Sequence, residues 1–130
     1  MNKLSITIRK FDYKYGNYQN PSQKVLHKQI LKLHRNIKKK DTIYTEYSIE
    51  KDSDKSKYHT HLLIHYNNRN NLYTQLSRFI GGDDWKIREK GLDTFDECNG
   101  KYGLIYTEPI LNELQYRKYM NKRELTKTLI

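Results

Sequence analysis

Two runs of alternating side chains stand close together in the sequence, TIYTEYSIE at residues 42–50 and YHTHLLIHY at residues 58–66. Such alternation is typical of β-strands that bury one face. The residues between the runs, KDSDKSK, are all polar and predict a turn. We therefore expect an antiparallel hairpin, whose pairing fixes which side chains of the two strands meet.

The alternation assigns the hairpin side chains to two faces. One face is mainly apolar and should pack under helices; its members are Ile43, Tyr47, Ile49, Thr60, Leu62 and Ile64. The other face, which we expect to be uncovered, carries His59, His61, Leu63 and His65 with Glu46, Ser48 and Glu50. Any chemistry at the hairpin is expected on this second face.

The remaining elements are placed outward from the hairpin. Leu4–Arg9 alternates like a strand, and apolar spacing predicts one helix from an N-cap at Ser22 to about Lys39 and another over Asn70–Ile80. Further expected elements are a loop at Phe11–Pro21, a strand at Trp85–Arg88, a loop rich in Gly, Asp and Asn, a strand at Lys101–Thr107 and a helix at Ile110–Glu124. This order favours a single α+β domain, residues 1–130, of the ferredoxin-like split β-α-β type. A central antiparallel sheet would carry the helices on one face and a metal site on the other.

The composition is strongly basic and rich in tyrosine. The formal net charge is +10 and the chain has 12 tyrosines, which favours nucleic acid as a partner and unpaired bases in particular. The cations at residues 38–40 either complement the end of the first helix or contact DNA. Mean hydropathy is −1.03 and no apolar run approaches a membrane span, so we expect a soluble, cytoplasmic protein. The single Cys98 fits a reducing compartment and is expected to be an incidental thiol in a polar loop.

His59 and His61 are the candidate metal ligands. Residues two apart on a strand point the same way, about 6–7 Å apart. If the turn centres on Asp54 and Lys55, Glu50 lies opposite His59, and the three side chains suit Mg²⁺ or Mn²⁺. Glu46 is the weaker alternative carboxylate, and His65 lies too far along the strand. The alternative is that both histidines are ordinary polar residues on an exposed sheet face.

Candidate nucleic-acid contacts lie in two places. The loop residues Tyr13, Lys14, Tyr15 and Tyr18 suit stacking and hydrogen bonding to unpaired bases, or else close one edge of the core. Lys86 and Arg88 are expected on the face of the histidines and either grip the backbone or form a solvated strand edge.

The arrangement resembles the HUH endonucleases of the replication-initiator (Rep) type. In that family an acidic residue on one strand and a His-hydrophobic-His run on the next hold the ion, as Glu50, His59 and His61 would here. The departure is Thr60, where the family usually has an apolar residue; that position faces the helices. The family also needs a tyrosine nucleophile on a later helix, commonly with lysine three residues on. Tyr119 and Lys122 match that pattern, with Tyr116 as a second candidate or a packing residue.

The resemblance implies a metal-dependent, sequence-specific nickase and strand-joining enzyme. It would act on single-stranded DNA at a replication origin through a 5′-phosphotyrosine intermediate and initiate rolling-circle replication. No P-loop pattern is present, so unwinding would fall to a host helicase. The free 3′-hydroxyl that the resemblance implies would be extended by a host polymerase. A single-tyrosine HUH transposase remains an alternative, as does a non-catalytic ferredoxin-like module that binds nucleic acid. The oligomeric state is left open.

Overall fold

The computed structural model describes residues 1–52, 57–110, 114 and 127–130. The helices are α1 (Gln23–Lys38) and α2 (Arg69–Phe79). The strands are β1 (Asn2–Lys10), β2 (Asp12–Lys14), β3 (Asn17–Gln19), β4 (Tyr44–Lys51), β5 (Tyr58–Tyr66), β6 (Trp85–Lys90), β7 (Asp93–Gly100), β8 (Gly103–Pro109) and β9 (Lys127–Leu129). The α+β class expected from the sequence is confirmed.

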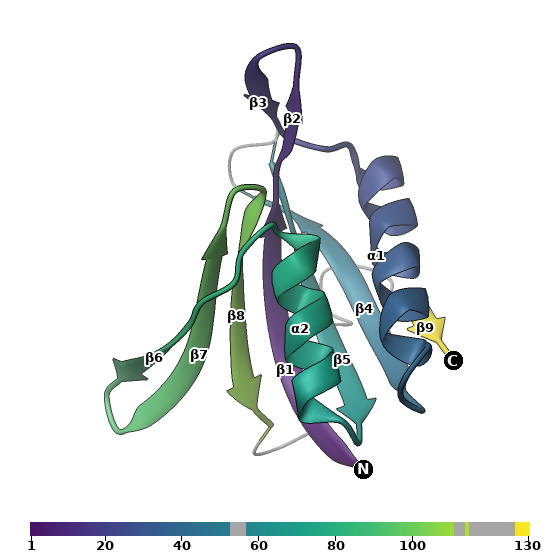
Figure 1. Cartoon of the computed structure of the whole chain (residues 1–130), viewed down its shortest axis with the longest axis vertical. Helices are drawn as coiled ribbons and strands as arrows, with labels where there is room; N and C mark the ends of the chain where they lie inside the picture. The colour runs from purple at the N-terminus through teal and green to yellow at the C-terminus, as the bar shows by residue number, and fades with distance from the viewer. Residues whose placement is uncertain (53–56, 111–113, 115–126) are drawn as a thin grey trace.

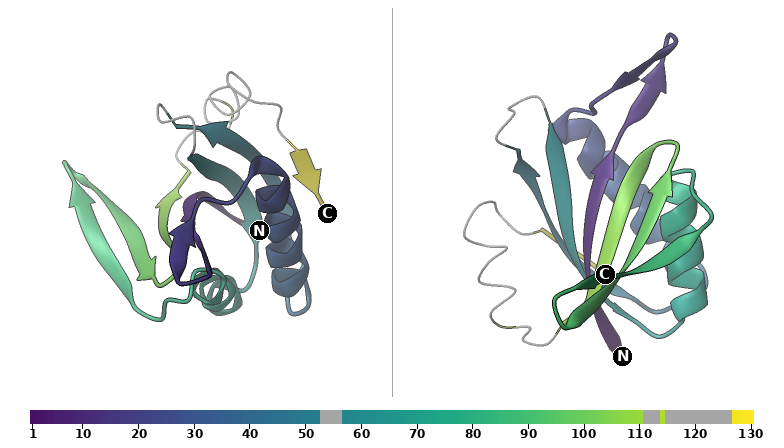
Figure 2. Two further views of the ribbon diagram at one scale, coloured as in Figure 1. Left: turned by 90° about the horizontal axis from the view of Figure 1, so that it is seen from above. Right: turned by 90° about the vertical axis from the view of Figure 1, so that its left-hand side faces the viewer.

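One antiparallel sheet contains seven of the strands in the order β6-β7-β8-β1-β5-β4-β9, with β1 at its centre (Figure 1). β2 and β3 pair with each other as a separate hairpin that projects from the sheet (Figure 2). The sheet curves, and α1 and α2 lie side by side within that curve (Figure 2). Both described helices therefore cover the same face, as predicted.

The core lies between the helices and this sheet face. Leu4, Ile6 and Ile8 of β1 are buried, and their partners across β5 are Ile64, Leu62 and Thr60. The helices also make polar contacts with the same face: His34 of α1 hydrogen-bonds Thr45 at 2.9 Å, and Tyr73 of α2 hydrogen-bonds Thr107 at 2.9 Å. The expected N-cap is confirmed, because the Ser22 hydroxyl accepts a hydrogen bond from the Val25 amide.

The β4–β5 hairpin has the predicted register. Glu50 is the partner of His59, and Ser48 is the partner of His61. The apolar side chains assigned to the helix side are buried there. The opposite face is not uncovered along its whole length, since Leu63 and Ser48 are 0% and 3% exposed. The expectation of an uncovered face was wrong at these two residues. Covering this part of the face is favourable, because it removes the apolar Leu63 side chain from water.

Two stretches expected to be loops form hairpins. Asp12–Lys14 and Asn17–Gln19 pair through a turn in which Tyr15 and Gly16 both have positive φ, 53° and 77°, the backbone of a tight hairpin turn. The polar stretch after β6 is strand β7, and β8 begins at Gly103 rather than Lys101. Polar composition misled the prediction, because β6 and β7 form the outer end of the sheet, where few side chains are buried.

Cys98 was also misplaced by sequence reasoning. It lies on β7, opposite Trp85, and its side chain is fully buried in the core rather than in a polar loop. The expected helix at Ile110–Glu124 falls almost entirely outside the described residues. β9, which was not predicted, pairs with β4. Among the described residues, neither helix has the length and apolar composition needed to span a bilayer.

Candidate metal centre

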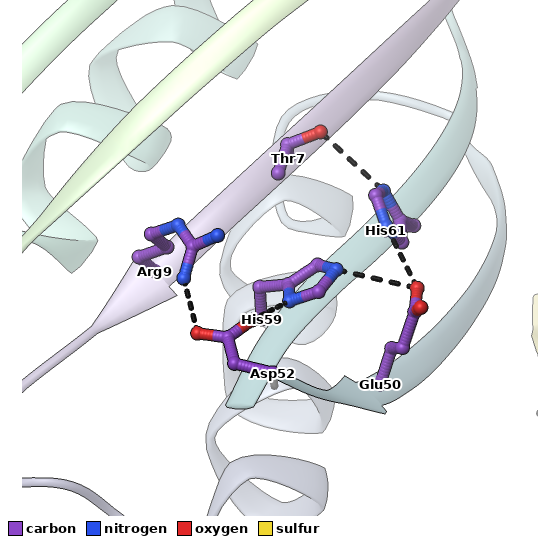
Figure 3. A network of polar contacts seen from close by, with 6 residues as sticks. All are labelled: Thr7, Arg9, Glu50, Asp52, His59 and His61. Carbon is purple, nitrogen blue, oxygen red and sulfur yellow. Dashed lines mark hydrogen bonds and ion pairs between the residues drawn. The ribbon is translucent and has the colours of Figure 1, made fainter. Parts of the chain in front are cut away.

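Glu50, His59 and His61 converge on one point of the sheet face opposite the helices (Figure 3). The Nε2 atoms of His59 and His61 lie 3.2 and 3.3 Å from the same carboxylate oxygen, Oε2 of Glu50. One ligand atom from each residue lies within 4.8 Å of the other two. The three side chains are 13–14% exposed. The group predicted from the sequence is therefore present, and its ligand atoms are close enough to hold one metal ion.

Asp52 positions the ring of His59. Its carboxylate accepts a hydrogen bond from His59 Nδ1 and forms an ion pair with Arg9 of β1 (Figure 3). Burial alone would raise the pKa of Asp52, but the hydrogen bonds and charges of Arg9 and His59 outweigh it and hold that pKa below its usual value. An ionised Asp52 fixes the proton of His59 on Nδ1, which leaves the Nε2 lone pair toward Glu50.

Thr7 has the corresponding position beside His61. It is the partner of His61 across the β1–β5 pair, and its hydroxyl lies 3.4 Å from His61 Nδ1. When Nδ1 donates to this hydroxyl, the lone pair of Nε2 points to the common centre. Each histidine is therefore held through the nitrogen that does not face Glu50, which is the arrangement usual for metal-ligating histidines.

Sequence reasoning missed Thr7, Arg9 and Asp52. Asp52 follows Glu50 by two residues, so strand alternation carried one residue further would have placed it on the same face. Thr7 and Arg9 share a face of β1 by the same rule, but only the β1–β5 register puts them beside the histidines.

The weaker candidates lie outside the cluster, as expected. Glu46 accepts a hydrogen bond from the Tyr44 hydroxyl at 2.7 Å, and His65 packs against the Tyr44 ring at 5.2 Å between centroids. Neither belongs to the group of converging ligand atoms in the described part of the chain.

The donor set suits a divalent cation. One carboxylate and two imidazoles leave open positions for water or a phosphate oxygen, and this mixed set accepts several first-row ions. A nitrogen-rich set favours Mn²⁺ over Mg²⁺, which prefers oxygen ligands. The geometry therefore provides three ligand atoms that are close enough together to hold one divalent cation.

The residues predicted to contact nucleic acid lie in two places outside this centre. Tyr13, Tyr15 and Tyr18 are on the projecting β2–β3 hairpin and are 47%, 95% and 59% exposed, while Lys14 is also exposed. Lys86 and Arg88 lie on β6. Cross-strand partners connect Lys86 to His61 in one row across the sheet. The row runs from Lys86 through Glu97, Tyr106 and Thr7 to His61. They therefore share the face of the histidines, four strand spacings or roughly 19 Å away.

The predicted nucleophile residues Tyr116, Tyr119 and Lys122 lie outside the described residues, so their place relative to the cluster stays a prediction. β8 and β9, the described strands before and after them, flank β4 and β5, which carry the cluster, and β1, which lies beside it.

Comparison of the chain with models of protein families, with curated proteins and with solved structures gives no match.

Proposed function

We propose that the chain is a metal-dependent nickase and strand-joining enzyme for single-stranded DNA, of the HUH type. The observation that carries the proposal is the convergence of Glu50, His59 and His61, with both Nε2 atoms directed at one carboxylate oxygen. The strand order β8-β1-β5-β4, with α1 between β1 and β4 and α2 between β5 and β8, supports a ferredoxin-like arrangement. The β6–β7 hairpin is then an insertion before the last of these four strands.

The residues of the centre have separate roles in this proposal. Glu50, His59 and His61 would hold Mn²⁺ or Mg²⁺, and the ion would supply polarisation of the scissile phosphate and neutralisation of charge in the transition state. Asp52 and Thr7 hold the imidazoles in the tautomers that ligate. Arg9 neutralises Asp52, which keeps a second negative charge from repelling the phosphate.

The nucleophile in this proposal is the Tyr119 hydroxyl, with Tyr116 as the alternative and Lys122 as the nearby cation. The phenol oxygen attacks the phosphorus and forms a phosphotyrosine link to the 5′ end of the downstream strand. The bond to the 3′ oxygen breaks, and this oxygen takes up a proton as the phenol loses one. The reverse reaction joins strands. The exposed tyrosines of β2–β3 would stack on unpaired bases of the origin strand. A host polymerase would then extend the free 3′-hydroxyl, and a host helicase would unwind the duplex.

The test is covalent capture of DNA. A labelled pool of single-stranded oligonucleotides is incubated with the protein and Mn²⁺, then separated on a denaturing gel. We expect an adduct that is absent in Glu50→Gln and in Tyr119→Phe and unchanged in Tyr102→Phe, a control at a tyrosine that has no role in the proposed reaction. An adduct that persists in Tyr119→Phe but disappears in Tyr116→Phe moves the nucleophile. No adduct with any divalent ion refutes the enzyme.

A non-catalytic nucleic-acid module is the second candidate, and one observation favours it. Phe95 and Tyr106 form an edge-on ring pair, 5.6 Å between centroids, on the same sheet face as the cluster. Aromatic side chains on an exposed sheet bind single strands without metal. Single-strand affinity that is unchanged by EDTA and lost in Tyr106→Ala, with no adduct formed, would support this module.

A further inference from the structure

The helix layer carries a charge pattern that the metal centre does not use. Neither α1, QKVLHKQILKLHRNIK, nor α2, RNNLYTQLSRF, contains an aspartate or glutamate, although the chain has 15. The two helices contribute seven lysines and arginines, and two more lysines follow α1 directly. The helical side of the molecule is therefore basic, whereas Glu50 and Asp52 lie on the other side.

A groove of about 650 Å³ lies on this basic side and is lined by both helices. Its cations come from β1, α1, α2 and the two residues that follow α1, and are Lys10, Lys32, Lys39, Lys40 and Arg78. Lys10 lies on β1 in the same alternation as Leu4, Ile6 and Ile8, so it faces the helices while Arg9 faces the metal centre. The groove and the metal centre are therefore on opposite faces of the sheet.

The groove has few internal counter-charges. Lys10 pairs with Asp12 at 3.3 Å and lies over the ring of Phe79. In the described part of the chain, none of Lys32, Lys39 and Arg78 forms an ion pair. The amides of Gln29, Asn36 and Gln75 line the same groove and add neutral hydrogen-bonding groups between the cations.

We propose that this groove binds the sugar-phosphate backbone of a base-paired nucleic-acid segment. Cations and amides contact phosphates and sugars without reading sequence. A groove for unpaired bases would present aromatic rings, and the only aromatic lining residue in the described chain is Phe79, which Lys10 covers. The groove is also far larger than a single phosphate group requires. A second nucleic-acid site on the face away from the metal centre lets the protein hold a duplex or hairpin independently of its single-strand chemistry.

The alternative is that these cations are an ordinary solvated surface. A matched pair of variants separates the two cases. The groove variant is Lys32→Gln/Lys39→Gln/Arg78→Gln, and the control is Lys24→Gln/Lys28→Gln/Arg35→Gln. The control residues are exposed cations of α1 that do not line the groove. Both variants lower the formal net charge by three, so only the position of the charges differs.

The measurement is the binding of a labelled duplex of mixed sequence to the full chain in EDTA, over a range of salt concentrations. We expect the groove variant to bind about 10–100-fold more weakly near 0.1 M salt, with the slope of log affinity against log salt reduced by up to about 2.7. The control should change far less. Gln75→Glu, which adds a carboxylate to the groove, should weaken binding as well. Thermal unfolding confirms that each variant is folded.

Two results overturn the proposal. Equal losses in the groove and control variants would show a diffuse charge effect. Competition by polyglutamate as effective as that by unlabelled duplex would point to an acidic protein partner instead. Glu50→Gln should retain duplex binding, so failure of the metal-centre proposal leaves this result unchanged.

Discussion

Asp52→Asn tests whether the metal centre depends on the residue that orients His59. The substitution keeps the shape of the side chain and removes its charge. An asparagine no longer holds the His59 proton on Nδ1 by charge, and it weakens the contact with Arg9. Partners that orient metal ligands in this way usually contribute about 10–100-fold to metal affinity. We therefore expect Asp52→Asn to bind Mn²⁺ about 10–100-fold more weakly than the unmodified chain.

The loss of Mn²⁺ affinity should also appear as a smaller increase in the free energy of unfolding when metal is added. At a Mn²⁺ concentration 100 times the dissociation constant, bound metal adds about 2.7 kcal/mol to the free energy of unfolding. A variant with about 10–100-fold weaker affinity gains only about 1.4 to 0.4 kcal/mol at that concentration. Without metal, the variant also loses about 1–2 kcal/mol, because two charge-assisted hydrogen bonds weaken and the Arg9 side chain is 41% exposed, which limits its contribution.

Asp96→Asn is the matched control. Asp96 also receives hydrogen bonds from an arginine, Arg69 at 3.0 Å, and from a ring hydroxyl, Tyr73 at 2.7 Å, but on the helix side of the sheet. Burial raises the pKa of Tyr73 to about 12, so this hydroxyl stays protonated and donates. We expect a similar loss of stability without metal and unchanged Mn²⁺ affinity. Calorimetric titration and urea unfolding measure both quantities. Unchanged affinity in Asp52→Asn, or equal loss in Asp96→Asn, would refute the role of Asp52.

Three further predictions concern buried residues. Burial lowers the pKa of His34 below its usual 6.5. As the pH falls, His34 is therefore protonated in the unfolded chain at a higher pH than in the folded chain. Urea unfolding should show stability that is full above about pH 6.5 and falls below it, less steeply in His34→Asn. Burial, followed by the charges of Asp83 and Asp84, raises the pKa of the Cys98 thiol, which should react with a thiol reagent only on unfolding; rapid reaction in the native state would contradict its burial. Leu63→Ala should lower the free energy of unfolding by about 2–5 kcal/mol, as for a core leucine. A loss below about 1 kcal/mol would show that Leu63 is exposed on the face that carries the histidines.

The part of the centre that lies on one hairpin was accessible from the sequence. Alternation fixes the faces of Glu50, His59 and His61. The length and polarity of the turn fix which residues are opposite, since a slip of one residue would turn every ligand to the wrong face. These are local constraints over fewer than 20 residues, so periodicity and turn position are enough to define them.

The rest depends on pairing between distant parts of the chain. Thr7 and Arg9 reach the histidines only because β1 pairs with β5. This pairing depends on the packing of the whole sheet and cannot be read from either strand alone. β7 was missed because strand propensity reflects burial against neighbours. Asp96 and Glu97 are neighbours on β7 and point to opposite faces of the sheet. They form ion pairs with Arg69 and Arg88 instead of packing against apolar side chains.

The placement of the ligands on central strands has a consequence for how the centre works. The other face of the β4–β5 hairpin is fixed in the core by Ile49, Leu62 and Ile64, and β1 supports the histidines from the adjacent position. The ligand geometry is therefore set by packing that does not involve a metal, as in sites preorganised on rigid elements. An ion that bound here would have little chain to order. The same strand β1 sends Lys10 to the basic groove on the other side. A single strand thus contributes side chains both to the metal centre and to the basic groove.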